Sequence, residues 1–174
     1  MAETIVDRIY KDNLVLLEYL SLQKEISFAS QFDVTFKKYL LLSSASFFEE
    51  EICRILQAFV ERKTSNDKCI TSLVKRRVIE RQYHTYFEWD KKNANKFFAL
   101  FGDEFKSQVA QKIKSDTSLD NAVKSFLELG HMRNCLVHQN FASYTIERTA
   151  KEVYELYQDA MKFVQWLSDN FDSF

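Results

Sequence analysis

The ten residues HMRNCLVHQN, at positions 131 to 140, bring together side chains that can move protons and hold anions. They include two histidines, His131 and His138, together with Arg133 and Asn134. An imidazole can act as an acid or a base near neutral pH, and a guanidinium offers a planar pair of donors to phosphate oxygens. Residues of these types could therefore transfer a proton beside a phosphate group.

The spacing of this segment places Arg133 on an apolar face. Because each residue of a helix turns by about 100°, Arg133 continues a stripe of apolar residues, Phe126, Leu129 and Leu136. A cation in that position needs a partner or a role. Arg133 and His138 are five steps apart, or about 140° around the helix, so their side chains diverge. If the two act together, the helix must end or bend between them, or a second copy of the chain must complete the site.

A structural explanation of the same residues stays open. A histidine near a helix C-terminus often binds the last carbonyl groups, and an arginine can extend out of a half-buried stripe to water. Arg77 and His84 form a comparable pair, with six residues between them. Spacing alone therefore does not decide whether these residues form a functional site or an ordinary helix surface.

The elements that position these residues should all be helices. The 174 residues contain no proline and only two glycines, Gly102 and Gly130, so the usual residues of tight hairpins are missing. Nearly half of the residues (46%) are apolar, which is enough for one packed core. The sequence therefore predicts an all-α helical bundle that forms a single domain over residues 1–174.

Apolar periodicity predicts where the helices lie. The expected ranges are about 3–24, 34–62 after the SQFD segment, parts of 69–82 and 105–116, the 116–140 stretch, and a last helix from about 145 or 147 to 170. Gly102 should be a helix C-cap. Thr117 and Asp120 should cap the start of the helix that contains the candidate site.

The segment RNCLVH resembles the motif of HEPN domains. In their ribonuclease members an arginine, often followed by asparagine, precedes a histidine with four to six residues between them. Arg133, Asn134 and His138 fit this pattern with four intervening residues. The segments FLELGHMRN, YLLLSSASFFEEEI and FEWDKKNANKFFALFG also resemble the RiboL-PSP-HEPN subgroup, so the resemblance covers most of the chain.

This resemblance implies an all-α bundle of the HEPN type and a metal-independent endoribonuclease. The RNA would supply its own nucleophile, the 2'-hydroxyl, and the products would be a 2',3'-cyclic phosphate and a 5'-hydroxyl end. The family also implies a symmetric homodimer in which two motifs face each other, which would answer the divergence of Arg133 and His138. Such an enzyme could be a toxin or a phage-defence effector, with an antitoxin or another defence component as its partner.

The candidate catalytic residues follow from this chemistry. His138 is the candidate for proton transfer and Arg133 for stabilising the phosphate. Asn134 is expected to orient His138, which lies four residues later on the same ridge. Glu49 is expected to face inward and to support Arg133 or His138, because it aligns with Ala45, Ile52 and Leu56. A simple surface acid is the alternative for Glu49.

Contact with RNA requires a local basic patch, because lysine and arginine (24) nearly balance aspartate and glutamate (25) over the whole chain. The best patch lies in KRRVIERQYH and comprises Lys75, Arg76, Arg77 and Arg81. The aromatic residues that follow could stack on unpaired bases, although a place in the core is the commoner outcome for such residues. They are Tyr83, Tyr86 and Trp89.

No cofactor and no metal is expected, because the histidines and cysteines lack the spacing of metal ligands. Cys53, Cys69 and Cys135 are an odd and widely spaced set, which indicates reduced thiols. No stretch approaches the roughly twenty uninterrupted apolar residues of a membrane span, so we expect a cytoplasmic protein. Asn140 stands where HEPN toxins controlled by an adenylating nucleotidyltransferase commonly have a tyrosine, so control by modification at that position is not expected.

Two other readings of the sequence stay open. One is a non-catalytic HEPN-like module that dimerises or binds nucleotide or RNA and keeps the motif as a binding element. The other is a helical scaffold in which Arg133 satisfies an internal carboxylate such as Glu49.

Overall fold

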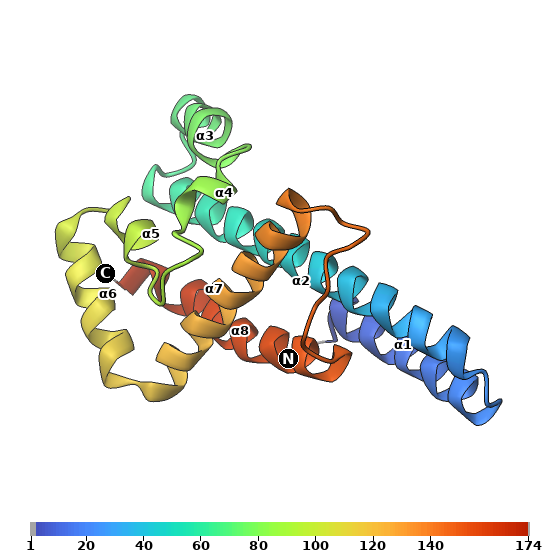
Figure 1. The fold of residues 1–174 in the computed structure, drawn as a ribbon. Coiled ribbons are helices and arrows are strands. Elements are labelled where there is room, and N and C mark those ends of the chain that lie inside the picture. The colour runs from blue at the N-terminus through green and yellow to red at the C-terminus, as the bar shows by residue number, and fades with distance from the viewer. Residues whose placement is uncertain (1–2, 174) are drawn as a thin grey trace. The chain divides into compact units, whose positions relative to one another are not determined.

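The computed structural model describes residues 3–173, with side chains for all of them except residue 172. Every regular element in this range is a helix, which confirms the predicted all-α fold (Figure 1). The elements are α1 Ile5–Leu22, α2 Ile26–Lys63, α3 Lys68–Val74, a π-helix η1 Lys75–Ile79, α4 Tyr83–Tyr86, α5 Asn95–Ala99, α6 Asp103–Ser115, α7 Thr117–His138, α8 Ala150–Asn170 and a short 3₁₀ turn η2 Phe171–Ser173.

The chain forms two compact units. The first comprises the residues up to Phe47 together with Leu129–Gln158, and the second comprises Phe48–Glu128 with the residues from Asp159 onward. The boundaries fall within α2, α7 and α8. A single domain over residues 1–174 stays a prediction.

In the first unit, α1 runs antiparallel to the beginning of α2 (blue in Figure 1). The Thr4 hydroxyl accepts a hydrogen bond from the Asp7 amide at 3.1 Å, and the Asp7 carboxylate accepts one from the Thr4 amide at 2.7 Å. This reciprocal cap satisfies amides that the first turn of a helix otherwise leaves unpaired. The helix predicted near residues 3–24 is therefore confirmed and begins at a well-formed cap.

Aromatic and polar contacts join α1 to α8 within the same unit. The Tyr10 ring stacks on Tyr154 with 3.9 Å between ring centroids. The Tyr154 hydroxyl donates to an Asp7 oxygen at 2.8 Å, and the hydroxyls of Thr4 and Tyr157 lie 2.7 Å apart. The start of α1 and the α8 helix, more than 140 residues apart in the sequence, are therefore joined by hydrogen bonds as well as by ring packing.

The second helix begins at Ile26, eight residues earlier than predicted. The polar SQFD segment, residues 30 to 33, suggested a break, but Ser30 and Gln31 lie on the exposed face of a continuous helix. Asp33 pairs with Lys37 one turn later, with 3.1 Å between Oδ2 and Nζ. Polar residues on a solvent-facing side do not interrupt a helix, so the prediction of its start was wrong.

The second unit has a core rich in phenylalanine. The Phe126 ring lies 5.0 to 5.5 Å from the rings of Phe48, Phe87 and Phe163. Tyr83 and Tyr86, which follow the basic patch in the sequence, are 8% and 4% exposed. Their place in the core confirms the commoner outcome for these aromatic residues, and it removes both as surfaces on which a base could stack.

Two helix caps differ from the prediction. The α7 helix is capped by Asp116, whose Oδ1 accepts hydrogen bonds from the amides of Ser118 and Leu119 at 2.9 and 3.1 Å. Thr117 is already the first helical residue. Gly102 does not end the preceding helix but is the N-cap of α6, with a φ of 100° that favours glycine.

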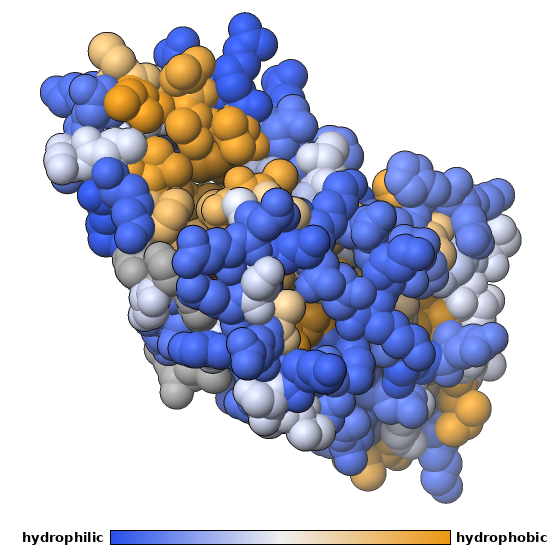
Figure 2. Space-filling view, turned by 90° about the vertical axis from the view of Figure 1, so that its left-hand side faces the viewer, coloured by the Kyte–Doolittle hydropathy of each residue, from blue (hydrophilic) through white to orange (hydrophobic). Residues whose placement is uncertain are grey.

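Apolar side chains also gather on the surface of the second unit. Ile70, Leu73 and Val78 are between 48% and 63% exposed, and Figure 2 shows apolar residues collected over α3 and the π-helix at the top of that view. In the described part of the chain no helix is both long and apolar enough to cross a membrane.

Candidate functional site

The α7 helix ends at His138, and its last two turns position the candidate residues. Leu129 and Leu136 are fully buried, with 0% of their surface exposed. Arg133 lies between them in the sequence and is half-buried, whereas His138 is exposed. The helix therefore ends at the histidine, and the arginine sits beside the buried stripe as the periodicity indicated.

The Arg133 guanidinium is held by its neighbour in the chain. Arg133 Nη1 donates to Asn134 Oδ1 with a separation of 3.1 Å. Asn134 is thus a hydrogen-bond partner of Arg133, and its expected role in orienting His138 stays a prediction. His131 is exposed, and its Nε2 lies 3.5 Å from Cys135 Sγ on the outer face of the helix.

A hydrogen-bonded turn follows His138 directly. The Asn140 side chain accepts a bond from the Ala142 amide at 3.0 Å, and the Asn140 carbonyl accepts one from the Tyr144 amide at 2.9 Å. Burial raises the pKa of the Tyr144 hydroxyl, and the charges of Cys135 and Glu147 act in the same direction. Asn140 thus shapes the loop directly after the motif.

Lys38 supports this loop from α2 and was not found by sequence reasoning. It is only 5% exposed, and its ammonium donates to the carbonyl oxygens of Phe141 and Ala142 at 2.6 and 3.4 Å. The signal in the sequence is weak, because a lysine followed by apolar residues such as Leu40 and Leu41 also reads as an ordinary helix surface. Only the contact across 103 residues reveals its role.

Glu49 is exposed, so the expectation that it faces inward is wrong. Its neighbours Phe48 and Ile52 take the buried side of α2, with 1% and 0% of their surface exposed. Glu49 belongs to the second compact unit and the Arg133–His138 motif to the first. Support of the motif by Glu49 stays a prediction.

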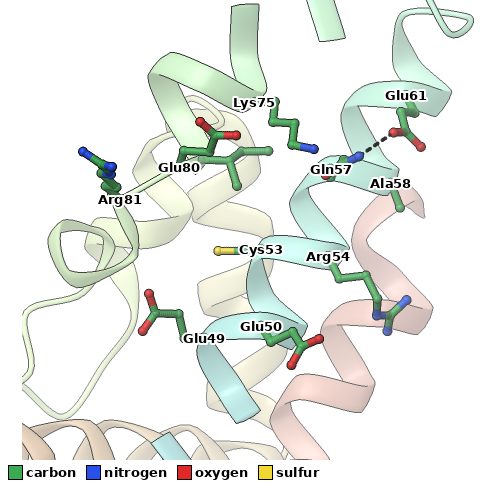
Figure 3. Close-up of a pocket in the computed structure, with 11 residues that line it drawn as sticks. Glu49, Glu50, Cys53, Arg54, Gln57, Ala58, Glu61, Lys75, Glu80 and Arg81 are labelled. Atoms are coloured by element: carbon green, nitrogen blue, oxygen red, sulfur yellow. Dashed lines mark hydrogen bonds between the residues drawn. The ribbon is translucent and has the colours of Figure 1, made fainter. Parts of the chain in front are cut away.

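Within the second unit Glu49 lines a cavity of about 450 Å³ (Figure 3). Lys75 and Arg81 of the predicted basic patch line it as well, together with Glu80. In Figure 3 the Cys53 thiol points into this cavity, and burial raises the pKa of that thiol, with a further contribution from Glu49. The cavity therefore brings three of the predicted residues together within one unit.

The two remaining residues of the basic patch, Arg76 and Arg77, lie on the π-helix and are exposed. This element is closed by a bond from the Glu80 amide to the Lys75 carbonyl at 2.8 Å, and Arg81 follows with a φ of 61°. The π-helix and the left-handed backbone conformation of Arg81 together determine where the basic side chains point. All four basic residues remain accessible to an anionic partner.

An all-α chain whose long penultimate helix ends on an arginine–histidine motif has the fold of the HEPN class. Residues 7–172 match the family described as RiboL-PSP-HEPN, and the chain belongs to this family. No curated protein and no solved structure matches it.

Proposed function

We propose that this protein is a metal-independent endoribonuclease and that Arg133 and His138 form its active site. The observation that carries the proposal is the pair at the end of α7, an exposed histidine five residues after a half-buried arginine whose guanidinium is bound by Asn134. Membership of the RiboL-PSP-HEPN family supports an RNA-related role for this pair.

The reaction is an internal transesterification. The 2'-oxygen of the RNA forms a bond to the phosphorus while the bond from phosphorus to the 5'-oxygen breaks. His138 accepts the proton of the 2'-hydroxyl, and a second acid gives a proton to the departing 5'-oxygen. Arg133 binds the phosphate oxygens as the phosphorus becomes five-coordinate. The products are a 2',3'-cyclic phosphate and a 5'-hydroxyl end.

The second acid would come from another copy of the chain. One motif provides one histidine, whereas the reaction needs both a base and an acid. In a symmetric dimer with facing motifs, His138 of the partner subunit supplies the missing proton. In such an arrangement one His138 accepts a proton and the other donates one.

The basic residues of the second unit would hold the rest of the RNA. Lys75, Arg76, Arg77 and Arg81 are exposed, and each phosphate that such a residue neutralises makes binding more sensitive to salt. Replacing Arg76 and Arg77 by alanine should therefore weaken RNA binding and reduce its dependence on salt concentration.

The test is incubation of the purified chain with total RNA in the presence of a chelator. We expect cleavage by the wild type, a loss of at least about a hundredfold in His138→Ala and Arg133→Ala, and fragments that end in a cyclic phosphate by mass spectrometry. His131→Ala and Arg8→Ala are matched controls, since both residues are exposed and lie outside the proposed site.

Intact RNA, or equal cleavage by all variants, would favour a non-catalytic module that binds nucleotide or RNA. A strictly monomeric mass in solution would contradict the shared site. A role as a toxin or defence effector requires that expression of the wild type arrests growth and that His138→Ala does not.

A further inference from the structure

The loop after α7 presents an exposed phenylalanine. Phe141 is 52% exposed although it is a large apolar residue, and its neighbours Gln139, Asn140 and Ser143 are exposed polar residues. The loop itself is ordered by the bonds that Asn140 accepts from the amides of Ala142 and Tyr144. The loop after α7 is therefore ordered, and it leaves the Phe141 ring exposed to solvent.

Lys38 holds this ring as well as the loop. Its Nζ lies 4.9 Å from the centroid of the Phe141 ring and 2.6 Å from the Phe141 carbonyl oxygen. Among the described residues, no carboxylate forms an ion pair with this buried ammonium. Burying a charge is costly without compensation, and here the compensation comes from two carbonyl groups and one aromatic face.

We propose that Phe141 is a base-stacking residue for the RNA substrate, and that Lys38 positions it beside His138. The proposal rests on the proposed function, since it names how that same site recognises its substrate. One face of the ring lies toward the ammonium, and the exposed remainder is available to an unpaired base adjacent to the phosphate at which His138 acts.

The position of the ring suits this role. Three residues span at most about 11 Å, so Phe141 lies close to any phosphate that His138 contacts. Aromatic side chains stack on unpaired bases of any sequence. The exposed amides of Gln139 and Asn140 beside the ring can also bind base edges.

A second copy of the chain is the competing occupant of this surface. The centre of a protein interface is poor in charged residues, whereas this ring rests on a lysine ammonium and is bordered by polar side chains. These surroundings favour a nucleic acid base over the apolar surface of another subunit.

The test measures binding without cleavage, in a parent protein with the substitution His138→Ala. A fluorescently labelled single-stranded RNA of mixed sequence is titrated, and its anisotropy reports the dissociation constant. Adding Phe141→Ala or Phe141→Leu should weaken binding about tenfold, and Phe141→Trp should preserve it. Phe28→Ala is the matched control, because Phe28 is a 64% exposed phenylalanine of the same unit and should leave the dissociation constant unchanged.

An RNA with single abasic positions identifies the stacked base. At one position, removal of the base should weaken binding to the parent but not to the Phe141→Ala variant, because each change removes the same contact. Lys38→Met should behave as Phe141→Ala does, with the far-ultraviolet circular dichroism of the parent. A lysine that only stabilised the fold would not make the protein insensitive to that one abasic position.

Three results would overturn the proposal. They are equal affinity of the parent and Phe141→Ala, full affinity of Phe141→Leu, and conversion of a dimer to a monomer by Phe141→Ala. Because the parent cannot cleave, the two proposals fail separately. Cleavage by the native chain without any dependence on Phe141 contradicts only the stacking role, whereas binding through Phe141 without cleavage contradicts only the nuclease. A parent that does not bind RNA contradicts the stacking role, and the cleavage assay with the native chain tests the nuclease independently.

Discussion

At the scale of single residues, the contact that orients the candidate site joins two neighbours in the chain. Arg133 Nη1 donates to Asn134 Oδ1 at 3.1 Å, so one direction of a long and flexible side chain is fixed before any substrate binds. A donor that is already oriented costs less entropy when it binds a phosphate. In the proposed enzyme Asn134 would act through Arg133, and an effect of Asn134 on His138 stays a prediction.

We expect Asn134→Ala to lower the rate of RNA cleavage about tenfold, since the loss of one hydrogen bond to a charged group corresponds to roughly 1.5 kcal/mol. The measurement is the initial rate on a labelled RNA. Gln31→Ala removes an exposed amide elsewhere in the same unit and should leave the rate unchanged. If both variants cleave like the wild type, Asn134 does not position Arg133.

Lys38 should also affect stability. Replacing it by methionine keeps most of its buried aliphatic side chain but leaves the Phe141 and Ala142 carbonyls without their donor. We expect this loss to lower the free energy of unfolding by about 1 to 3 kcal/mol. Urea titration measures this change. Lys11→Met is the control, because Lys11 pairs with Glu3 on the surface and its side chain is 63% exposed. Equal stability of the two variants would contradict a structural role for Lys38.

At the scale of elements, the beginning and the end of α7 were predicted with different success. The end at His138 agrees with the expectation that the helix stops near the motif. The cap at the beginning was misplaced by one residue, because the sequence DTSLD offers both an aspartate and a threonine as capping groups. Only the directions of the Ser118 and Leu119 amides, which point to Asp116, decide between them.

Substitution distinguishes the two capping residues. Asp116→Ala should reduce the free energy of unfolding by about 1 kcal/mol, because two amides of the first turn lose their acceptor. Thr117→Ala should be close to neutral, since Thr117 is the first residue of the helix and alanine is tolerated there. Chemical denaturation of both variants tests this, and a larger effect for Thr117→Ala would restore the original assignment.

At the scale of the whole molecule, the beginning of the chain is bonded to its last long helix. Burial alone would raise the pKa of Asp7, but hydrogen bonds from the Thr4 amide and the Tyr154 hydroxyl hold it below its ordinary value of 3.8. Burial and the bond to Asp7 raise the pKa of Tyr154 to about 12. The hydrogen bond between the Tyr154 hydroxyl and the Asp7 carboxylate requires a protonated tyrosine and an ionised aspartate, so it is complete only over a limited range of pH.

We expect Tyr154→Phe to lower the free energy of unfolding by about 1 kcal/mol at pH 7. Because the pKa of Asp7 is lowered in the folded state, the difference between wild type and variant should shrink as the pH falls below 3.8. Because the pKa of Tyr154 is raised, the difference should also be lost as the pH rises from 10.0 towards about 12. Urea titrations across this range test both limits.

Tyr19→Phe is the control, because Tyr19 is 58% exposed and belongs to the same unit. Its stability should follow that of the wild type at every pH. Equal stability of Tyr154→Phe and the wild type at every pH would show that Tyr154 contributes through packing alone, because phenylalanine keeps the ring and lacks only the hydroxyl that donates to Asp7.

Local patterns predicted the helices and the motif, because both depend on residues within a few turns of one another. The absence of proline and the apolar periodicity were sufficient for the all-α fold, and Arg133 stood out on its stripe. Glu49 was misjudged because its alignment with Ala45 and Ile52 lies at the edge of the buried face. Lys38 could not be found, since its partners Phe141 and Ala142 lie more than 100 residues away.

The burial of Lys38 also has a chemical consequence. An amine that is 5% exposed and bound to two carbonyl groups is protected from acylating reagents, whereas the 63% exposed side chain of Lys11 is not. Brief treatment with an amine-reactive label, followed by peptide mass spectrometry, should modify Lys11 and spare Lys38. The chain thus contains its own reporter for the integrity of the loop beside His138, which can be followed without a substrate or an attached dye.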